Sequence, residues 1–462
     1  MSLFNTVHSH YSELPEWMIR AMGAVYYTLP RSKRYSRNYS VTEKELCKTE
    51  YMSQDEIENR INERFLHTVR NAFEHVPYYR KRWREEGIDI QAIKDIRDIV
   101  LLPTIDKEEL RNHCNELISE KVDVSNLMYV TTSGSTGNPV GFYQPKGMLM
   151  TEWAYVMHIW RRVGCTPESS RLVLRGKPIH PNHIDPNWFY DPLRRELSID
   201  IFNMTDENME RYCQAIERYK PEFVHGYMSA IQMLSKYIEK RGGLEHRFKA
   251  VLATSENVLP EQKEYVEKVC GARVFSFYGH SERLVIAGSC EKSDAYHVEP
   301  MYGYAELLDK DGQTALCGEL VATGFLNEAM PLIRYRTGDL AEWEEGKVCS
   351  CGRFHARLKG VYGRWHQDML VTDEGAHVSL TALNIHSNEF DYLVRYKLVQ
   401  ETPGIVRMLI LPGSGYDAAC GERIQSLLEK KVGGHIQFKI DIVEDMPLLK
   451  NGKFKIIEQK IK

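Results

Sequence analysis

The sequence predicts an α/β fold, with a large N-terminal domain over residues 1–365 and a small α+β C-terminal domain over residues 366–462. Three patterns support this prediction. The first ~125 residues have helical periodicity, the stretch from about residue 148 to residue 279 alternates helices with strands, and short strands with turn signals follow residue 295. The N-terminal domain is therefore expected to have a helical start, a mainly parallel sheet and a β-rich subdomain.

Length and composition are those of an ordinary globular chain. It has 462 residues, of which 43% are hydrophobic and 27% charged, which suits about two to three structural units. The net charge of −4 argues against a nucleic-acid partner. The 10 cysteines are scattered, as reduced thiols are. With neither a secretory signal nor an apolar run of about 18 residues, the chain is expected to be cytoplasmic and without a transmembrane segment.

Capping signals predict two early helices. Ser53 and Glu56 form a capping box before apolar residues that recur every four positions: Ile57, Ile61, Phe65, Val69 and Phe73. The same signal recurs before a second apolar series, with Asp106 and Glu109 followed by Leu110, Cys114 and Leu117. A helix is expected to begin at each signal.

The central part alternates helices with strands. The expected helices contain "GMLMTEWAYVMHIW", "TDENMERYCQAIERY" and "SAIQMLSKYIEK", and a fourth begins at Pro260 and ends at Gly271. The expected strands are "RLVLR", "EFVHGY", "FKAVLAT" and "RVFSFYG". Because ligands of such sheets bind at the carboxyl ends of the strands, the residues that follow each strand are candidate site residues.

Strand signals dominate after residue 295. The segments "YGYAELLDKDGQ", "GELVATGF", "LIRYRTGDLAEW" and "EEGKV" predict an antiparallel sheet or a small barrel. Beyond about residue 363, the C-terminal domain is expected to have strands in "YLVRYKLVQ", "IVRMLIL" and "IQFKIDIV" and a helix near "GERIQSLLEKKV".

The stretch "TTSGSTGNP" follows the expected strand "LMYV". Its hydroxyls and glycines suit a phosphate, and they belong to Thr131, Thr132, Ser133, Gly134, Ser135, Thr136 and Gly137. No Gly-Lys-Ser/Thr closes the stretch, so it is not a Walker loop. Taken alone, it is equally well explained as a solvated Ser/Gly turn.

Four later segments carry further candidate groups. "FYGHSE" contains Tyr278 and Glu282, "IRYRTGD" ends at Asp339, "GVYGRW" contains Arg364, and "NGKFK" contains Lys453. Taken singly, these residues are a core aromatic, solvated charges and a turn aspartate. The order of the five segments along the chain makes them informative together.

Together these segments resemble the adenylate-forming (AMP-binding) enzyme superfamily, which activates carboxylic acids with ATP through an acyl-adenylate. The resemblance covers essentially the whole chain. Within the superfamily, "HVPYYRKRW", "LPTIDKEELR" and "CSCGRFHARLKGVYGR" resemble the branch of phenylacetate-CoA ligases and capsular-polysaccharide-biosynthesis (CapK-like) proteins.

The resemblance implies a role for each segment. The implied catalytic residues are Lys453, Glu282 and Thr132. Glu282 would hold a magnesium ion, and Lys453 would contact the attacking carboxylate and the α-phosphate. The Ser/Thr/Gly loop would hold departing pyrophosphate, Tyr278 would pack on adenine, and Asp339 would bind the ribose hydroxyls. The implied ATP-binding residues are Thr131, Ser133, Gly134, Ser135, Thr136, Gly137, Ser255, Glu256, Tyr278, Gly279, His280, Ser281, Asp339 and Arg364.

A mobile C-terminal domain is also implied, which rotates at the hinge near Arg364 so that Lys453 leaves the site between two half-reactions. "GRWHQDML" is one residue longer than the usual hinge segment, so either Gln367 or Asp368 is the pivot. The phosphate loop lacks the lysine of many relatives, which is expected to weaken pyrophosphate binding. Ser281 stands where threonine is commoner and keeps the hydroxyl donor.

The carboxylic acid is expected to bind at strand ends beside His225, Tyr227, Phe277 and Arg175. For any one of these residues, core packing is the better explanation from the sequence alone. The polar segment "RLVLRGKPIHPNH" is either a solvated loop or a binding site for a polar or acidic substrate.

Cys349 and Cys351 are separated by one residue, and Cys290 and His297 occur upstream. From spacing alone, two unrelated loops with incidental thiols explain these residues as well as a metal site does. Some members of the resembled branch carry zinc at the corresponding loops, which implies a closed, structural Cys3His site here. Cys317 is a spare candidate ligand.

The expected function is an AMP-forming acid-CoA ligase, similar to phenylacetate-CoA ligase, with ATP and magnesium as cofactors and coenzyme A as acyl acceptor. The alternative is an amide-forming ligase that passes the acyl group to an amine of a sugar or amino acid in surface polysaccharide biosynthesis. The joint presence of Glu282, Asp339 and Lys453 argues against an inactive scaffold. A homodimer is a further option.

Overall fold

A computed structural model describes residues 14, 16–132, 140–176, 179, 185–346, 348–362, 369–378, 380–383, 387–413, 415–446 and 456–461. Its helices are α2 (Glu16–Thr28), α3 (Arg31–Arg34), α4 (Arg37–Thr49), α5 (Gln54–His75), α6 (Pro77–Glu85), α7 (Lys107–Asn112), α8 (Met148–Arg161), α9 (Asp206–Tyr219), α10 (Met228–Lys240), α11 (Pro260–Cys270), α12 (Leu380–Leu383) and α13 (Ala418–Lys431).

The strands fall into four sheets. Those of the N-terminal part are β1 (Leu127–Thr131), β2 (Gly141–Pro145), β3 (Arg171–Leu174), β4 (Trp188–Asp191), β5 (Glu196–Ile199), β6 (Phe223–Gly226), β7 (Ala250–Ala253), β8 (Arg273–Gly279), β9 (Ile286–Ser289), β10 (Tyr296–Val298), β11 (Gly303–Leu308), β12 (Cys317–Gly324), β13 (Tyr335–Trp343) and β14 (Arg357–Tyr362). The C-terminal strands are β15 (Leu370–Val371), β16 (His377–Val378), β17 (Leu393–Thr402), β18 (Ile405–Pro412), β19 (Gln437–Ile442) and β20 (Ile457–Gln459).

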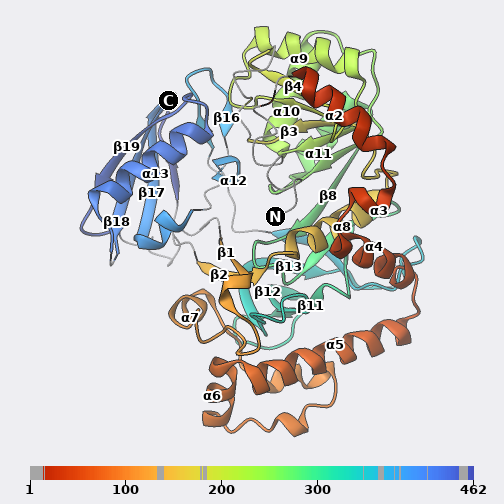
Figure 1. Cartoon of the computed structure of the whole chain (residues 1–462), viewed down its shortest axis with the longest axis vertical. Helices are drawn as coiled ribbons and strands as arrows, with labels where there is room; N and C mark the ends of the chain where they lie inside the picture. The colour runs from red at the N-terminus through yellow and green to blue at the C-terminus, as the bar shows by residue number, and fades with distance from the viewer. Residues whose placement is uncertain are drawn as a thin grey trace.

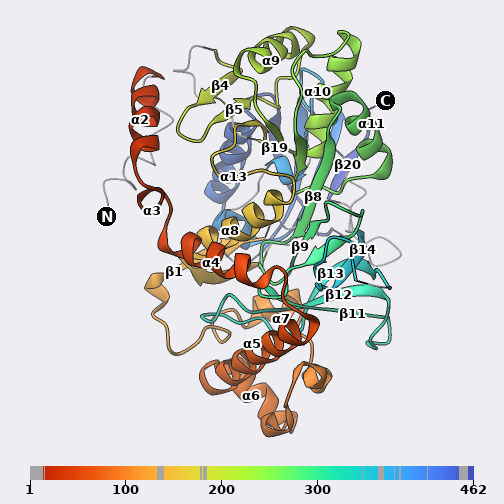
Figure 2. The same cartoon turned by 90° about the vertical axis from the view of Figure 1, so that its right-hand side faces the viewer.

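One 12-stranded sheet organises the N-terminal part, in the order β11-β12-β13-β14-β10-β9-β8-β7-β6-β3-β5-β4. The strands β8, β7, β6, β3 and β5 are parallel, and β4 is an antiparallel edge strand. This confirms the expected parallel alternation. Side chains alternate between two covered faces: Val251 packs with residues of α9 and α10, while Leu252 packs with α8. Figures 1 and 2 show these helices around the sheet.

The antiparallel strands after residue 295 continue the same sheet through β9 and do not form a separate barrel. The prediction of a strand in "EEGKV" is wrong, because residues 344–346 and 348 lie outside strands. Glu, Gly and Lys are disfavoured in strands, so β13 ends at Trp343, before this segment, and the next strand, β14, begins at Arg357. The short strands β4, β5, β9 and β10 were not predicted from the sequence.

Both predicted capping boxes are present. Ser53 accepts from the backbone of Glu56, and the Glu56 side chain accepts from the Ser53 backbone at 2.9 Å, so α5 begins as expected. Asp106 and Glu109 cap α7 in the same way. This helix ends at Asn112, earlier than the apolar spacing indicated, and its core contribution is the buried Leu110.

The C-terminal part has the expected small α+β fold. Its four-stranded sheet has the order β19-β18-β17-β20, and α13 packs on it through Ile424 and Leu428. Strand β16 contacts α10, where the backbone N–H of His377 donates to the Met233 sulfur at 3.5 Å. Figure 1 shows this blue part of the chain beside the large sheet.

No helix in the described ranges combines the length and the apolar character needed to cross a membrane.

A buried ion pair fastens the segment before α7 to the sheet. Arg334 donates to Glu306 through Nη2 at 2.9 Å and Nε at 3.1 Å, and its Nη1 donates to the carbonyl of Leu102 at 2.6 Å. Both side chains are almost fully buried. Burial raises the pKa of Glu306, and the Arg334 charge opposes this rise.

We expect Glu306→Ala to lower the free energy of unfolding by about 3–5 kcal/mol, because it leaves the Arg334 charge buried without its carboxylate. Urea unfolding would measure the loss. Lys359→Ala breaks an exposed pair with Glu342 and should cost about 1 kcal/mol or less. Equal losses in the two variants would contradict this prediction.

Candidate functional site

Strand β8 carries the centre of the candidate site because it pairs differently on its two sides. Its parallel pairing with β7 ends at Ser276, and its antiparallel pairing with β9 begins at Phe277. The chain then turns, with the backbone N–H of Arg283 donating to the carbonyl of His280 at 3.0 Å. Gly279, His280 and Ser281 therefore form the connection between Tyr278 and Glu282 at the carboxyl end of the strand.

Tyr278 and Asp339 meet although they are far apart in the sequence. The Tyr278 hydroxyl donates to Oδ2 of Asp339 at 2.9 Å. Asp339 lies within β13, where the pairing with β12 is irregular and Gly338 has φ +73°, and its backbone N–H donates to Oγ1 of Thr337 at 3.1 Å. Burial and the Asp339 charge raise the pKa of Tyr278 well above its usual value, so it remains a neutral donor. The structure thus brings together the two residues implied for adenosine.

Glu282 is a buried carboxylate that stays ionised. It is 7% exposed and accepts a hydrogen bond from the Tyr335 hydroxyl at 2.9 Å. Burial alone would raise its pKa, but the charges of His280 and Lys107, with backbone and Tyr335 hydrogen bonds, lower it. An ionised oxygen ligand of this kind suits a hard divalent cation such as magnesium.

Lys107 is a candidate residue that sequence reasoning missed. It occupies the first position of α7 and lies close enough to Glu282 to lower the pKa of that carboxyl. The residue belongs to "LPTIDKEELR", which pointed to the branch but carried no assigned role. Neither ring nitrogen of the neighbouring His280 has a hydrogen-bond partner among the described residues.

The Ser/Thr/Gly stretch lies in a hairpin connection. Strands β1 and β2 are antiparallel, and Thr131 lies opposite Gly141. The Thr132 N–H donates to the Val140 carbonyl at 2.9 Å, and Thr132 Oγ1 accepts from the Val140 N–H at 3.1 Å. Thr132 therefore closes the base of the loop while its O–H remains a donor. Ser133, Gly134, Ser135, Thr136 and Gly137 lie outside the described residues.

The segment after β7 contains Ser255 and Glu256. Ser255 is exposed and has φ +63°, in the left-handed region that a non-glycine residue rarely adopts. Glu256 accepts from the N–H of Ser229 at 2.8 Å and from its hydroxyl at 3.0 Å. Since Ser229 lies in the first turn of α10, Glu256 caps that helix and holds the end of β7 beside it.

Three of the four predicted acid-pocket residues cluster at the ends of β3 and β6. The Arg175 guanidinium lies 5.7 Å from the ring centre of Tyr227, and His225 stacks edge-on to Trp160 with ring centres 4.7 Å apart. Burial, followed by the charges of Arg175 and Arg171, lowers the pKa of His225 well below its usual value, so its ring is neutral. Phe277 packs beside the same aromatic cluster as Trp160.

The predicted Lys453, Arg364, Gln367 and Asp368 lie outside the described residues. The chain on either side of the Lys453 segment is placed by β19 and β20. In the latter, Ile457 lies opposite Leu398 of β17 in a parallel pair.

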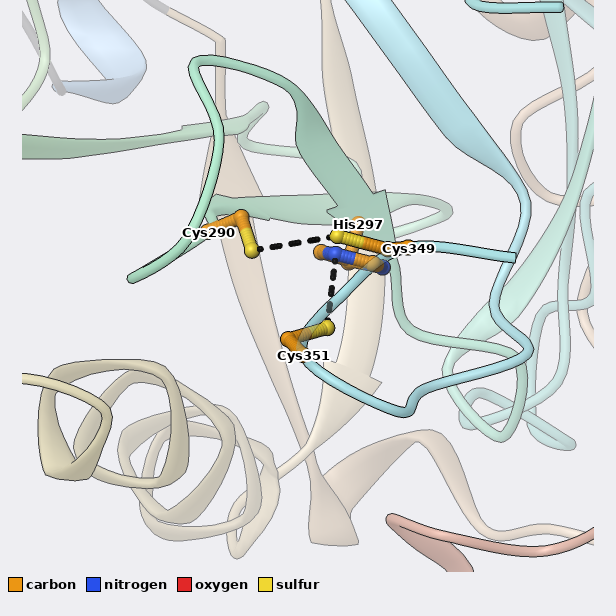
Figure 3. A group of neighbouring side chains, drawn as sticks. All are labelled: Cys290, His297, Cys349 and Cys351. Carbon is orange, nitrogen blue, oxygen red and sulfur yellow. Dashed lines mark hydrogen bonds between the residues drawn. The ribbon is translucent and has the colours of Figure 1, made fainter. Parts of the chain in front are cut away.

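A second cluster contains Cys290, His297, Cys349 and Cys351, whose potential ligand atoms all lie within 4.8 Å of one another (Figure 3). The sulfurs of Cys290 and Cys349 are 3.6 Å apart, too long for a disulfide, and the sulfur of Cys351 is 3.4 Å from Nε2 of His297. A tetrahedral zinc ion, with Zn–S of about 2.3 Å and Zn–N of about 2.0 Å, separates its ligand atoms by about 3.5–3.8 Å. The Cys290–Cys349 and Cys351–His297 separations are close to these values.

The protonation states of two members, His297 and Cys349, suit a metal, whereas burial raises the pKa of the Cys351 thiol to about 11. Burial, with the charge of Arg162 next, lowers the pKa of His297 to about 3, which leaves the neutral imidazole that binds metals. Burial raises the pKa of the Cys349 thiol, but hydrogen bonds from Cys351, Cys290 and Ser293 outweigh it and bring the pKa to about 7. A thiolate is therefore accessible near neutral pH.

Arg353 connects both loops of the cysteine cluster to the N-terminal helices. It is 2% exposed and donates through Nη1 to both Glu291 oxygens at 2.7 and 2.8 Å. Its Nε donates to Glu50 at 3.0 Å. Glu291 follows Cys290 directly, and Arg353 lies two residues after Cys351. The Arg353–Glu291 pair therefore fixes the loop of Cys290 relative to the loop of Cys351.

Comparisons with known proteins match almost the entire chain. Residues 370–460 match the family model described as the CapK C-terminal domain. Protein CapK of Staphylococcus aureus is 22% identical over 436 residues, covering 93% of this chain and 94% of that protein. Phenylacetate-coenzyme A ligase of Thermus thermophilus is 26% identical over 67% of this chain and 70% of its own length. The Escherichia coli ligase of the same name is 24% identical over 76% and 81%.

Solved structures of 2-hydroxyisobutyryl-CoA ligase share the fold. The structure with 2-HIB-AMP and CoA in the thioesterification state has a TM-score of 0.57 at 19% identity, covering 89% of this chain and 92% of that one. The open conformation has a TM-score of 0.55.

The chain therefore has the fold of the solved 2-hydroxyisobutyryl-CoA ligases, with Tyr278 and Glu282 at the end of β8 beside Asp339 of β13. The chain is homologous to CapK and to the phenylacetate-CoA ligases, and its residues 370–460 match the CapK C-terminal domain.

We expect Tyr335→Phe to lower the free energy of unfolding by about 1.5–3 kcal/mol at pH 7, because it removes a hydrogen bond to the ionised Glu282. The pKa of Glu282 is lowered in the folded state, so this stabilisation is complete above the ordinary pKa of 4.5 and is lost as pH falls through the folded value. The difference from the parent chain should therefore shrink in urea unfolding below about pH 4.

Tyr304→Phe is the matched control, because the Tyr304 hydroxyl forms no hydrogen bond to any described part of the chain. A pH-independent loss in Tyr335→Phe would contradict the role of Glu282 ionisation.

Proposed function

We propose that the protein is an AMP-forming acid-CoA ligase. A carboxylate oxygen of the acid attacks the α-phosphorus of ATP, and the bond to pyrophosphate breaks to give an acyl-adenylate. The thiol of coenzyme A then attacks the acyl carbon, loses its proton and displaces AMP. The homologous phenylacetate-coenzyme A ligases and the shared fold support both half-reactions.

The observation that carries the proposal is the meeting of three groups from two distant segments, β13 and the end of β8. Tyr278 offers a ring and is bonded to Asp339, whose carboxylate retains a second oxygen to accept ribose hydroxyls. Glu282 lies four residues beyond the ring and is ionised. These are the groups that an adenosine, its ribose and a magnesium-bound phosphate chain require.

The chain's own residues would position the reactants. Glu282 would hold a magnesium ion, which supplies neutralisation of phosphate charge. The loop over residues 133–137, closed at its base by Thr132, would bind the leaving pyrophosphate. Lys453 would neutralise charge between the carboxylate and the α-phosphate. Glu256 would act indirectly, since it caps α10 and so places the neighbouring segment.

Lys107 would supply a positive charge that the phosphate loop lacks. The loop contains no lysine, and Lys107 lies near Glu282 from a different segment, the start of α7. A positive charge beside Glu282 would attract the phosphate chain of ATP toward the magnesium-binding carboxylate.

The acid would bind between the ends of β3 and β6. The neutral His225 and the ring of Tyr227 would contact its apolar body, and the Arg175 guanidinium, 5.7 Å from the Tyr227 ring centre, would add one positive charge. This mixture favours an acid with both an aromatic or apolar body and a polar or anionic substituent over a bare phenyl ring.

An amide-forming ligase is the second candidate. The observation in its favour is the CapK match, which extends over 93% of the chain and includes the C-terminal domain. In this alternative, an amine of a sugar or amino acid would attack the acyl-adenylate in place of coenzyme A, within surface polysaccharide assembly.

We also propose the division into residues 1–365 and 366–462, with a hinge near Arg364. The CapK C-terminal domain match, which begins at residue 370, supports this boundary. Rotation at the hinge would remove Lys453 and admit the acceptor.

The cysteine cluster would hold a structural zinc ion. Three sulfurs and one imidazole complete a tetrahedral set, so the ion has no open position for substrate. It would join the β9–β10 hairpin to the connection between β13 and β14.

Pyrophosphate release with a panel of carboxylic acids tests the function. We expect acid-dependent release, with AMP and a thioester formed when coenzyme A is present, and an about 100-fold to 1000-fold lower rate of adenylation for Lys453→Ala. Lys460→Ala is the matched control, since this exposed lysine of the same terminal segment pairs with Glu401 and Glu458. Release that requires an amine would favour the amide-forming reading, and no release with any acid would refute both.

Metal analysis tests the zinc site. The purified protein should hold about one zinc per chain, and Cys349→Ser should lose most of it and unfold at a lower temperature. Cys317→Ser should leave the zinc content unchanged, because Cys317 is exposed and lies outside the cluster. Equal zinc content in all three proteins would exclude the site.

A further inference from the structure

Helix α2 has two apolar faces, and only one of them is covered. On the inner face, Ile19 is fully buried, and Gly23 lies so close to the β4–β5 turn that a Cβ there would be 3.0 Å from Pro192. The Tyr27 hydroxyl donates to the carbonyl of Leu193 at 3.0 Å. These contacts fix which face of the helix points outward.

The outward face is a mainly apolar stripe, in which the one polar side chain described, Thr28, donates its hydroxyl to the Val25 carbonyl at 2.7 Å. Trp17 is 70% exposed and Val25 is 62% exposed, with Ala21 and Ala24 exposed between them and Leu29 just beyond the helix. At 100° per residue, the four helical positions share one side. Among the α2 side chains that the structure describes, Arg20 is the only charged one at the edge of this stripe. A surface helix of a globular protein normally has polar residues on this side, so the stripe is suited to an apolar medium.

A basic segment follows the stripe directly. Its exposed cations are Arg31, Lys33 and Arg37, within "PRSKRYSR". Arg31 pairs with Glu43, whereas Lys33 and Arg37 form no ion pair with any residue that the structure describes. Arg34 holds this segment to α2, because its guanidinium lies 5.8 Å from the ring centre of Tyr26 and 5.4 Å from that of Tyr27.

We propose that α2 and the following basic segment form a docking surface for an anionic lipid bilayer. Trp17, Val25 and Leu29 would enter the interfacial region, where tryptophan is favoured, and Lys33 and Arg37 would face the anionic headgroups. The two features select a membrane over another protein because the apolar side chains and the cations lie in one short continuous segment. Figure 2 shows α2 at the outer edge of the molecule, beside the β4 strand. This inference is independent of the proposed ligase activity.

Cosedimentation of the full chain with lipid vesicles tests the surface. Phosphatidylcholine vesicles that contain about 30% of the anionic lipid phosphatidylglycerol should bind the protein at least tenfold more tightly than vesicles of phosphatidylcholine alone. The double variant Trp17→Glu/Val25→Glu should lose at least tenfold in binding. The double variant Lys33→Glu/Arg37→Glu should lose the preference for the anionic vesicles.

Matched controls are Lys310→Glu and Leu316→Glu, in the turn between β11 and β12, where Leu316 is 54% exposed. In Figures 1 and 2, β11 and β12 lie in the lower half of the view, whereas α2 lies in the upper half. The controls should bind vesicles like the parent chain, and all variants should keep its unfolding temperature. No vesicle binding by the parent chain, or equal loss in the controls, would overturn the proposal. It would also be overturned if the α2 variants convert a dimer to a monomer in light scattering while vesicle binding is unchanged, since a second copy would then cover the stripe.

Discussion

The double pairing of β8 is the constraint on which the rest of the structure depends. Hydrogen bonds up to Ser276 follow the parallel register of β7, and those from Phe277 follow the antiparallel register of β9. Neighbouring side chains on a strand point to opposite faces, so a slip of one residue in either pairing would turn Tyr278 away from Asp339. The same strand thus joins the two halves of the sheet and orients the candidate adenosine site.

Buried ion pairs position the N-terminal helices on the large sheet. Arg162 and Glu299 pair with almost no exposure, and Arg353 is held between Glu50 and Glu291. Removing such charges from water is costly, so each pair is favourable only where both partners arrive together. Any other placement of α4 would separate Glu50 from Arg353 and leave a buried cation without a carboxylate. The N-terminal helices are therefore positioned by electrostatics as well as by apolar packing.

Periodicity predicted the parallel sheet, because it follows from local sequence. Tyr278, Glu282 and Asp339 were singled out by the order of the motifs and the resemblance it implies, and Asp339 lies inside β13, not at the strand end that the sequence suggested. Contacts between distant residues were beyond this reasoning. Glu256 is a carboxylate in the predicted segment, but its partner Ser229 lies 27 residues away, so its capping role was not visible. Lys107 is likewise connected to Glu282 only by the packing of α7. The edge strand β4 was missed because it is short and half-buried, with weak alternation.

The cysteine cluster and the candidate active site are connected through one strand. On β9, Ala287 lies opposite Tyr278, and Cys290 follows the last residue of the same strand. Cys349 approaches Cys290 from a segment 59 residues away, so ligand bonds to a shared metal would crosslink β9 to the connection that precedes β14. A closed Cys3His set offers no position for substrate, and its influence on the chemistry would be positional. By fixing β9, it would fix the register that points Tyr278 at Asp339.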